Sequence, residues 1–112
     1  MRAFLPAQEK ELGTDIIIAT TLRDRLRGLL GRKSLPAGQG LLLRPCNGIH
    51  TFFMRFPIDA LFLDKENQVI VLYKNLQPNR LTSIYKAVHS VLELPAGTLD
   101  NKTAIGDKIE FS

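Results

Sequence analysis

The stretch "IDALFLDKENQVIVLYKNL", residues 58–76, decides the fold class of this chain. It holds two apolar runs of strand length, and the polar segment "DKENQ" (64–68) between them has the Asp and Asn typical of turns. In the first run, apolar residues stand at both odd and even positions, so both faces of that strand are expected to be covered. The stretch therefore predicts two strands joined by a turn, the first of them buried on both sides.

Similar runs occur on either side of this stretch. They are separated by segments rich in Gly, Pro, Asn and Asp, which are the residues of turns. Six or seven short strands with such spacing predict a mainly β fold, either a sandwich or a small barrel. The further predicted strands are "DIIIAT" (15–20), "GLLLRP" (40–45), "GIHTFFM" (48–54), "AVHSVLEL" (87–94) and "DKIEF" (107–111).

One short amphipathic helix is predicted near residues 21–31. Thr21 can cap its start, and Gly31 suits its end. Gly28 lies inside this range, and we interpret it as a point where the helix packs closely on a strand. Four leucines have the spacing of a single helix face: Leu22, Leu26, Leu29 and Leu30.

Length and composition predict a single globular domain over residues 1–112. A chain of this length buries roughly two-thirds of its unfolded surface, which is enough for one core. A single Cys cannot form an internal disulfide. Neither a secretory apolar run nor a membrane-spanning one is visible, so we expect a cytoplasmic protein without a membrane span.

The net charge of +4 raises the possibility of anionic partners, because basic residues gather in "RDRLRGLLGRK" (23–33). No aromatic residues are interleaved there for stacking on bases. We interpret this segment as a solvated basic helix face and expect no specific nucleic-acid binding. An adaptor that holds an anionic polymer through the Arg-rich helix stays open as an alternative.

A metal site in the segment "CNGIHTFFM" (46–54) is not expected. Cys46, His50 and Met54 are spaced by four residues and are ligand types that Cu(I) prefers. In a strand, however, His50 and Met54 would stand about 13–14 Å apart, whereas ligand bonds are only about 2.0–2.3 Å long. We therefore expect no metal and no cofactor, and we interpret Cys46 as a small core or turn thiol.

Two carboxylates are candidate functional groups. Asp59 lies in the buried run, so it must be protonated there or paired, either with backbone N–H groups or with Arg55 across a tight "RFP" connection. Glu93 shares a strand face with His89 and is interpreted as an exposed polar residue of an edge strand. For each carboxylate, contact with a ligand or a catalytic role is the alternative.

The chain resembles the family called domain of unknown function 192. The resemblance covers residues 19–107 and rests on "TLRDRLRGLLGRKSLPAGQGLLLRP" (21–45), "IHTFFMRFPIDALFLD" (49–64), "VLELPAG" (91–97) and "IGD" (105–107). Where many relatives read W-M-K-N-T, this chain reads "FMRFP" (53–57), so a role for Lys or Asn does not carry over. The resemblance implies a jelly-roll-like β-sandwich and brings no established activity. The matching positions are Arg25, Gly28, Leu29, Leu30, Arg32, Gly40 to Leu42, Met54, Ile58, Asp59, Glu93 to Gly97, Gly106 and Asp107.

The leading functional hypothesis is a non-enzymatic module that binds a small ligand or a protein partner. The alternative is a small enzyme that uses Asp59 or Glu93 as acid or base, together with His50 or His89. No nucleophile elbow, phosphate loop or paired zinc-ligand motif is present to favour the enzyme. The candidate ligand-binding residues are Arg25, Gly28, Met54, Arg55, Asp59 and Glu93.

Overall fold

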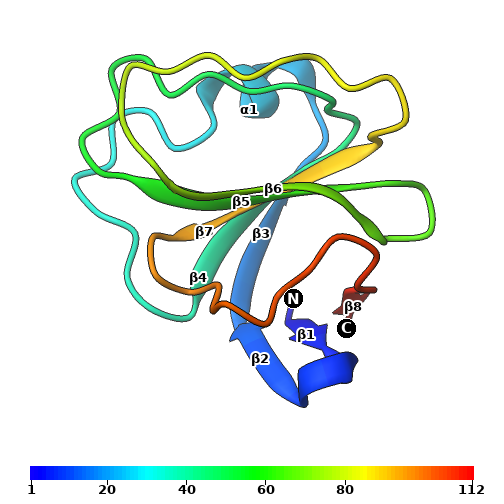
Figure 1. Ribbon diagram of the computed structural model, residues 1–112. Helices are drawn as coiled ribbons and strands as arrows, with labels where there is room; N and C mark the ends of the chain where they lie inside the picture. Colours follow the sequence, from blue (N-terminus) through cyan, green and yellow to red (C-terminus); the bar gives the residue numbers. More distant parts are fainter.

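The computed structural model describes residues 1–112 and consists of two β-sheets and one short α-helix (Figure 1). The mainly β prediction is therefore confirmed. Figure 1 shows three layers: a five-stranded sheet in the middle, a small sheet on one side, and the helix with long loops on the other. The elements are β1 (Ala3–Leu5), a 3-10 turn (Pro6–Gln8), β2 (Lys10–Gly13), β3 (Asp15–Ala19), α1 (Leu22–Arg27), β4 (Gln39–Leu43), β5 (Ile58–Leu63), β6 (Val69–Leu76), β7 (Ser90–Pro95) and β8 (Glu110–Phe111).

Strand β7 lies at the centre of the five-stranded sheet, whose order is β3-β4-β7-β5-β6. β7 pairs antiparallel with β4 on one side and with β5 on the other, and β5 in turn pairs with β6. Only β3 and β4 run parallel, and α1 lies in the crossover between them. The smaller sheet has the order β2-β1-β8.

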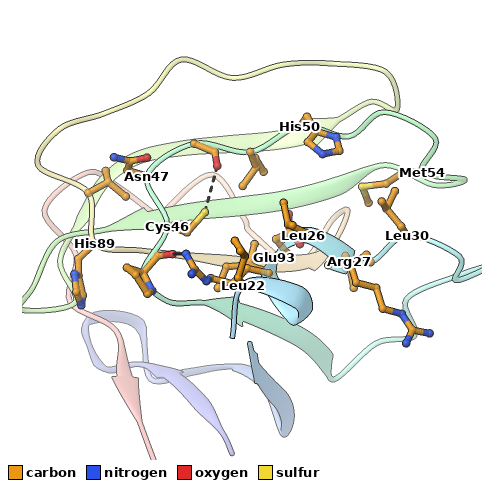
Figure 2. A pocket seen from close by; sticks show the side chains of 18 residues that line it. Leu22, Leu26, Arg27, Leu30, Cys46, Asn47, His50, Met54, His89 and Glu93 are labelled. Carbon is orange, nitrogen blue, oxygen red and sulfur yellow. Dashed lines mark hydrogen bonds between the residues drawn. The ribbon is translucent and has the colours of Figure 1, made fainter. Parts of the chain in front are cut away.

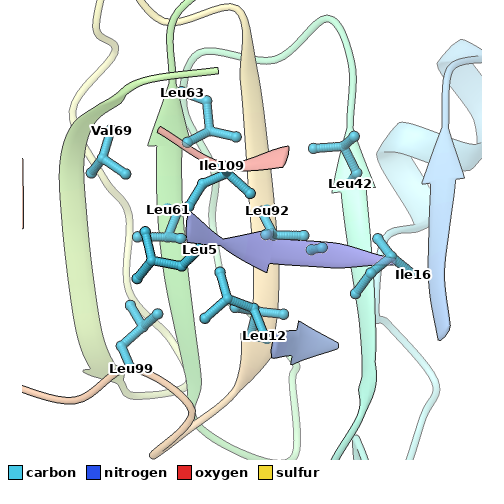
Figure 3. Packing of buried hydrophobic residues seen from close by; sticks show 12 residues of the cluster. Leu5, Leu12, Ile16, Leu42, Leu61, Leu63, Val69, Leu92, Leu99 and Ile109 are labelled. Carbon is cyan, nitrogen blue, oxygen red and sulfur yellow. The ribbon is translucent and has the colours of Figure 1, made fainter. Parts of the chain in front are cut away.

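The central sheet is covered on both faces, as the pattern of residues 58–63 predicts. On β5, Leu61 and Leu63 face the smaller sheet, whereas Ala60 and Phe62 face α1 and the loops. Each face carries a cluster of twelve buried apolar residues. Figure 3 shows the cluster between the sheets, which includes Leu5, Leu12, Ile16, Leu42, Leu61, Leu63, Val69, Leu92, Leu94, Leu99 and Ile109.

The predicted strand "GIHTFFM" (48–54) is wrong, because most of this segment is loop. It forms only one isolated bridge, between His50 and Leu81, and it turns at Phe53, whose φ is 66°. The buried Thr51 replaces strand pairing: its hydroxyl donates to the carbonyl of Gln77 at 2.7 Å and accepts from the backbone N–H of Arg80 at 2.9 Å. The strands β1 and β2 were not predicted, since three or four residues are too few to show an alternating pattern.

The helix is shorter than predicted, ending at Arg27 instead of continuing to residue 31. Thr21 caps its start as expected, accepting from the Asp24 N–H at 3.1 Å. Gly28 ends it with φ 48° and ψ −128°, a conformation that side chains disfavour. The close-packing interpretation of Gly28 is wrong, because a Cβ there would meet no atom nearer than 3.8 Å. With six residues, α1 is far too short to cross a bilayer, and there is no other α-helix.

Asp59 is almost completely buried and ties three backbone segments together. Its carboxylate accepts N–H groups from Asn75 at 2.8 Å, Gly97 at 3.1 Å and Leu99 at 2.9 Å. These bonds connect β5 to the end of β6 and to the turn after β7. The expected partner Arg55 is exposed and forms no ion pair with Asp59. Backbone donors are thus the partners, and Arg55 stays exposed on the loop before β5.

Replacing Asp59 with Asn should destabilise the fold. The amide NH₂ would face one of the three backbone N–H donors, leaving that donor unpaired, at a cost of about 1–3 kcal/mol in the free energy of unfolding. Denaturant unfolding at neutral pH measures this loss. The control is Asp64→Asn, which affects an exposed turn in which Asp64 accepts from the N–H groups of Glu66 and Gln68. Equal stabilities of Asp59→Asn and wild type would contradict a structural role for the carboxylate.

Candidate functional site

A pocket of about 450 Å³ lies between α1, the loop that follows β4, and the face of the central sheet (Figure 2). Half of its eighteen lining residues are apolar. This size and this mixture of residues are those of sites that bind small molecules. Three segments distant in sequence form the pocket: residues 22–30, 43–54 and 88–93.

The apolar wall of the pocket includes leucines of the predicted helix stripe. Leu22 and Leu26 on α1 line the pocket but remain 65% and 66% exposed. The predicted leucine stripe is therefore only partly buried: Leu29 packs in the core, whereas Leu22 and Leu26 lie over the cavity. The remaining apolar lining comes from Leu29, Leu30, Leu43, Pro45, Ile49, Met54 and Val88.

Glu93 is the buried polar group of this pocket. It lies on β7, directly between Leu41 of β4 and Ala60 of β5, and its side chain is only 3% exposed. Its interpretation as an exposed edge residue is wrong, because β7 is the central strand. The carboxyl has no ion pair: the two ion pairs of the chain, Arg2–Glu11 and Lys10–Asp100, lie elsewhere. It also makes no hydrogen bond with the protein.

Burial without a partner changes the protonation of Glu93. Removal from water disfavours the charged form and raises the pKa of the Glu93 carboxyl to about 8. At neutral pH the group is therefore mostly the neutral acid. A neutral carboxylic acid offers the cavity both an O–H donor and a carbonyl acceptor.

Cys46 and Arg25 supply the neighbouring polar atoms. The Cys46 thiol donates to the carbonyl of Gly48 at 3.2 Å, and its pKa is raised, chiefly by burial and further by the charge of Glu93. A protonated thiol is a weak nucleophile, so this environment does not activate Cys46. The Arg25 guanidinium donates through Nη1 to the carbonyl of Pro45 at 2.9 Å, while its buried Nε–H has no partner. Arg25 lines the pocket, but this Nε–H is a buried donor and not part of the accessible wall.

Neither histidine completes an acid–base pair. His50 and His89 both line the pocket, but Figure 2 shows them at opposite ends of it. The Nδ1 of His50 accepts the backbone N–H of Phe52 at 3.3 Å, and no hydrogen bond joins either imidazole to a carboxylate. The extended-strand argument about Cys46, His50 and Met54 rested on a strand that is in fact a loop. No group of three or more His, Cys, Asp or Glu side chains is arranged to hold a metal ion.

Only some of the six candidate ligand-binding residues line the pocket. Arg25, Gly28, Met54 and Glu93 line the pocket. Asp59 does not, because it precedes Ala60 on β5 and therefore points to the opposite face of the sheet from Glu93. Arg55 lies on the exposed loop outside the lining. Sequence reasoning missed Leu22, Leu26 and Cys46 as lining residues, and only the position of Gly28 after the two leucines signals an early end of the helix.

Comparison with known proteins identifies relatives. The model of the DUF192 family, described as "Uncharacterized ACR", matches residues 5–111. A UPF0127 protein of Thermococcus sibiricus is 33% identical over 99 residues, which are 84% of this chain and 64% of that protein. A UPF0127 protein of Pyrococcus abyssi is 41% identical over 64 residues, which are 56% of this chain and 54% of that protein. The matches thus span less than two-thirds of the length of these relatives.

Two crystal structures share the fold. A protein of Sinorhizobium meliloti, described as a candidate transcription regulator, superposes with a TM-score of 0.80 at 23% identity, covering 97% of this chain and 89% of its own. A protein of unknown function from Novosphingobium aromaticivorans superposes with a TM-score of 0.74 at 19% identity, covering 99% and 93%. At these identities the likeness shows the fold alone.

Replacing Glu93 with Gln should remove a pH dependence of stability. The folded pKa of Glu93 is raised to about 8 from an ordinary value of 4.5, so the folded state binds the extra proton between these pH values. Wild-type stability should therefore be full below pH 4.5 and fall as pH rises to about 8, by a total on the order of 5 kcal/mol. Glu93→Gln should lack this fall. Denaturant unfolding from pH 4 to 9 measures both, and parallel pH profiles would contradict the assignment.

Proposed function

The chain belongs to the DUF192 family, and from its pocket we propose that it is a non-enzymatic module that binds one small, largely apolar molecule. The molecule's apolar body would lie against Leu22, Leu26 and Met54. Its polar end would reach the carboxyl of Glu93. Four of the residues that the sequence singled out, Arg25, Gly28, Met54 and Glu93, would belong to this binding site.

One observation carries the proposal: the carboxyl of Glu93 lies in the middle of a sheet, only 3% exposed, and what exposure it keeps is towards the pocket, without an ion pair or hydrogen bond from the protein. Removing a carboxyl from most of its water costs free energy, and an apolar residue at position 93 would avoid this cost. Such a group is explained if a ligand supplies the missing hydrogen bonds. The cavity beside Glu93 gives that ligand room.

The polar atoms of the pocket restrict which chemical group the polar end of the ligand can carry. A neutral Glu93 carboxyl both donates and accepts a hydrogen bond. An end group that contains a carbonyl oxygen and an N–H or O–H satisfies this set. Primary amides and carboxylic acids are such groups. We infer an amphipathic ligand with one end of this kind.

The acid–base alternative has less support. An enzyme of this kind needs two titratable groups within hydrogen-bond reach in one cavity, and Glu93 has no such neighbour. The raised pKa of Cys46 also disfavours a thiolate nucleophile. A cytoplasmic location belongs to the proposal as well; its support is that the lone Cys46 is a free thiol.

The site can be tested with the fluorescent apolar dye 8-anilinonaphthalene-1-sulfonate. Wild type should bind the dye, and Leu26→Trp should weaken binding because the larger side chain fills the cavity. The matched control is Ile105→Trp, since Ile105 is exposed but lies outside the pocket. Equal dye binding by the Leu26→Trp variant and by wild type would contradict a ligand site here.

The role of Glu93 is tested by competition. Decanamide has an apolar chain and an end group that both donates and accepts, so it should displace the dye from wild type. Glu93→Leu should still bind the dye but should bind decanamide about tenfold more weakly, the value of about one hydrogen bond. Unchanged displacement in Glu93→Leu would show that ligands do not use the carboxyl.

A further inference from the structure

The end of the molecule around the pocket exposes large apolar side chains. Phe53, Leu81 and Ile84 are 85%, 74% and 77% exposed, and Phe52 is partly exposed beside them. Leu22 and Leu26 of α1, which line the pocket, are exposed as well. Exposed aliphatic and aromatic residues that gather in one region mark an interaction surface.

Three segments form this end of the molecule: residues 20–30, 46–57 and 77–89, which together we call the pocket end. All three contribute to the pocket lining. The second and third are joined by the His50–Leu81 bridge and by a hydrogen bond from the Phe53 N–H to Asn79 Oδ1 at 3.2 Å. In Figure 1 they are the green and yellow loops beside α1, on the side of the central sheet away from the chain termini.

The pocket end is also strongly basic. It contains six Arg or Lys residues and one acidic residue, Asp24, for a net charge of +5. The rest of the chain contains nine basic and ten acidic residues, for a net charge of −1. Nearly all acidic side chains thus lie outside the pocket end. The six basic residues are Arg23, Arg25, Arg27, Arg55, Arg80 and Lys86.

We propose that the pocket end docks on the surface of an anionic lipid bilayer, with Phe53, Leu81 and Ile84 entering the interface between the headgroups and the acyl chains. Peripheral proteins bind membranes in this way, through apolar side chains that insert and cationic side chains that attract anionic headgroups. The charge of the pocket end complements such a surface. This proposal goes beyond the function of the pocket and does not depend on it.

The combination of side chains favours a bilayer over a nucleic acid. Phosphate backbones are bound by Arg and Lys, and protruding aliphatic side chains add nothing to those contacts. Leu81 and Ile84 would remain in water on a nucleic acid, whereas a bilayer buries them. Arg55 and Arg80 flank these apolar residues in sequence and are themselves exposed, so they can reach headgroups at the same depth.

Co-sedimentation with vesicles tests the proposal. Wild type should bind vesicles of phosphatidylcholine with phosphatidylserine, and should bind vesicles of phosphatidylcholine alone at least about tenfold more weakly. Raising the salt from about 0.1 M to about 1 M should weaken binding, because the Debye length falls from about 10 Å to about 3 Å. A wild-type protein that stays in the supernatant with anionic vesicles at low salt would overturn the proposal.

Paired variants separate insertion from charge. Phe53→Asn with Ile84→Ser removes apolar contact, and Asn tolerates the positive φ of position 53. Arg55→Glu with Arg80→Glu reverses two charges. Each pair should reduce vesicle binding at least about tenfold. The matched controls should bind like wild type: Ile105→Ser for exposed apolar surface, and Lys65→Glu with Lys102→Glu for charge.

A labelled DNA duplex distinguishes the anionic-polymer alternative. If the charge pair loses vesicle and duplex binding together while the apolar pair keeps both, the surface is an electrostatic site for polyanions and the bilayer proposal is overturned. If the apolar pair loses vesicle binding alone, the proposal is supported. Thermal melts of every variant should match the wild-type melt, because all the substituted side chains are exposed. The dye assay is repeated on the apolar pair and on the charge pair, so that ligand binding in the pocket is measured separately from vesicle binding.

Discussion

The fold depends on the pairing of β7 with β4 and β5 in the middle of a sheet that is apolar on both faces. Leu92 and Leu94 of β7 face the smaller sheet, and Val91 faces α1 and the loops. Every inward position next to these residues is therefore shielded from water. Glu93 occupies one of these shielded positions, and this burial raises the pKa of its carboxyl. The same pairing that stabilises the fold makes the carboxyl expensive to bury.

The two buried carboxylates show how position on a strand separates structure from function. Asp59 of β5 points towards the smaller sheet and receives three backbone N–H groups, so its charge is satisfied by the protein itself. Ala60 follows Asp59 on β5 and pairs with Glu93 of β7. Glu93 therefore faces the cavity, where the protein gives it no partner. A shift of one residue on a strand changes the face, and here it also changes the role. The two carboxylates cannot share a cleft.

The sequence was informative wherever local pattern decides the outcome. The unbroken apolar run at 58–63 correctly indicated a strand covered on both faces, and the burial of Asp59 followed from it. Gly97 and Gly106, which match the family pattern, adopt a positive φ that glycine allows in turns. The central position of β7 in the sheet could not be predicted from the sequence. Pro95 indicates where this strand ends but not which strands pair with it. The loop at 48–54 was missed because its hydrogen bonds go to residues 77–82, far along the chain.

The early end of α1 connects the pocket with the exposed surface. A helix continuing to residue 31 would present Leu22, Leu26, Leu29 and Leu30 as one stripe, as their spacing predicts. Gly28 stops it, and only Leu29 of this set becomes fully buried, while Leu22 and Leu26 remain in contact with water. Exposed leucines give no benefit to an isolated fold, since an apolar residue contributes to stability only when it leaves water. Their position over a cavity with an unpaired acid, among basic side chains, is accounted for if something else covers them. A ligand in the pocket and a bilayer at the pocket end would do so together.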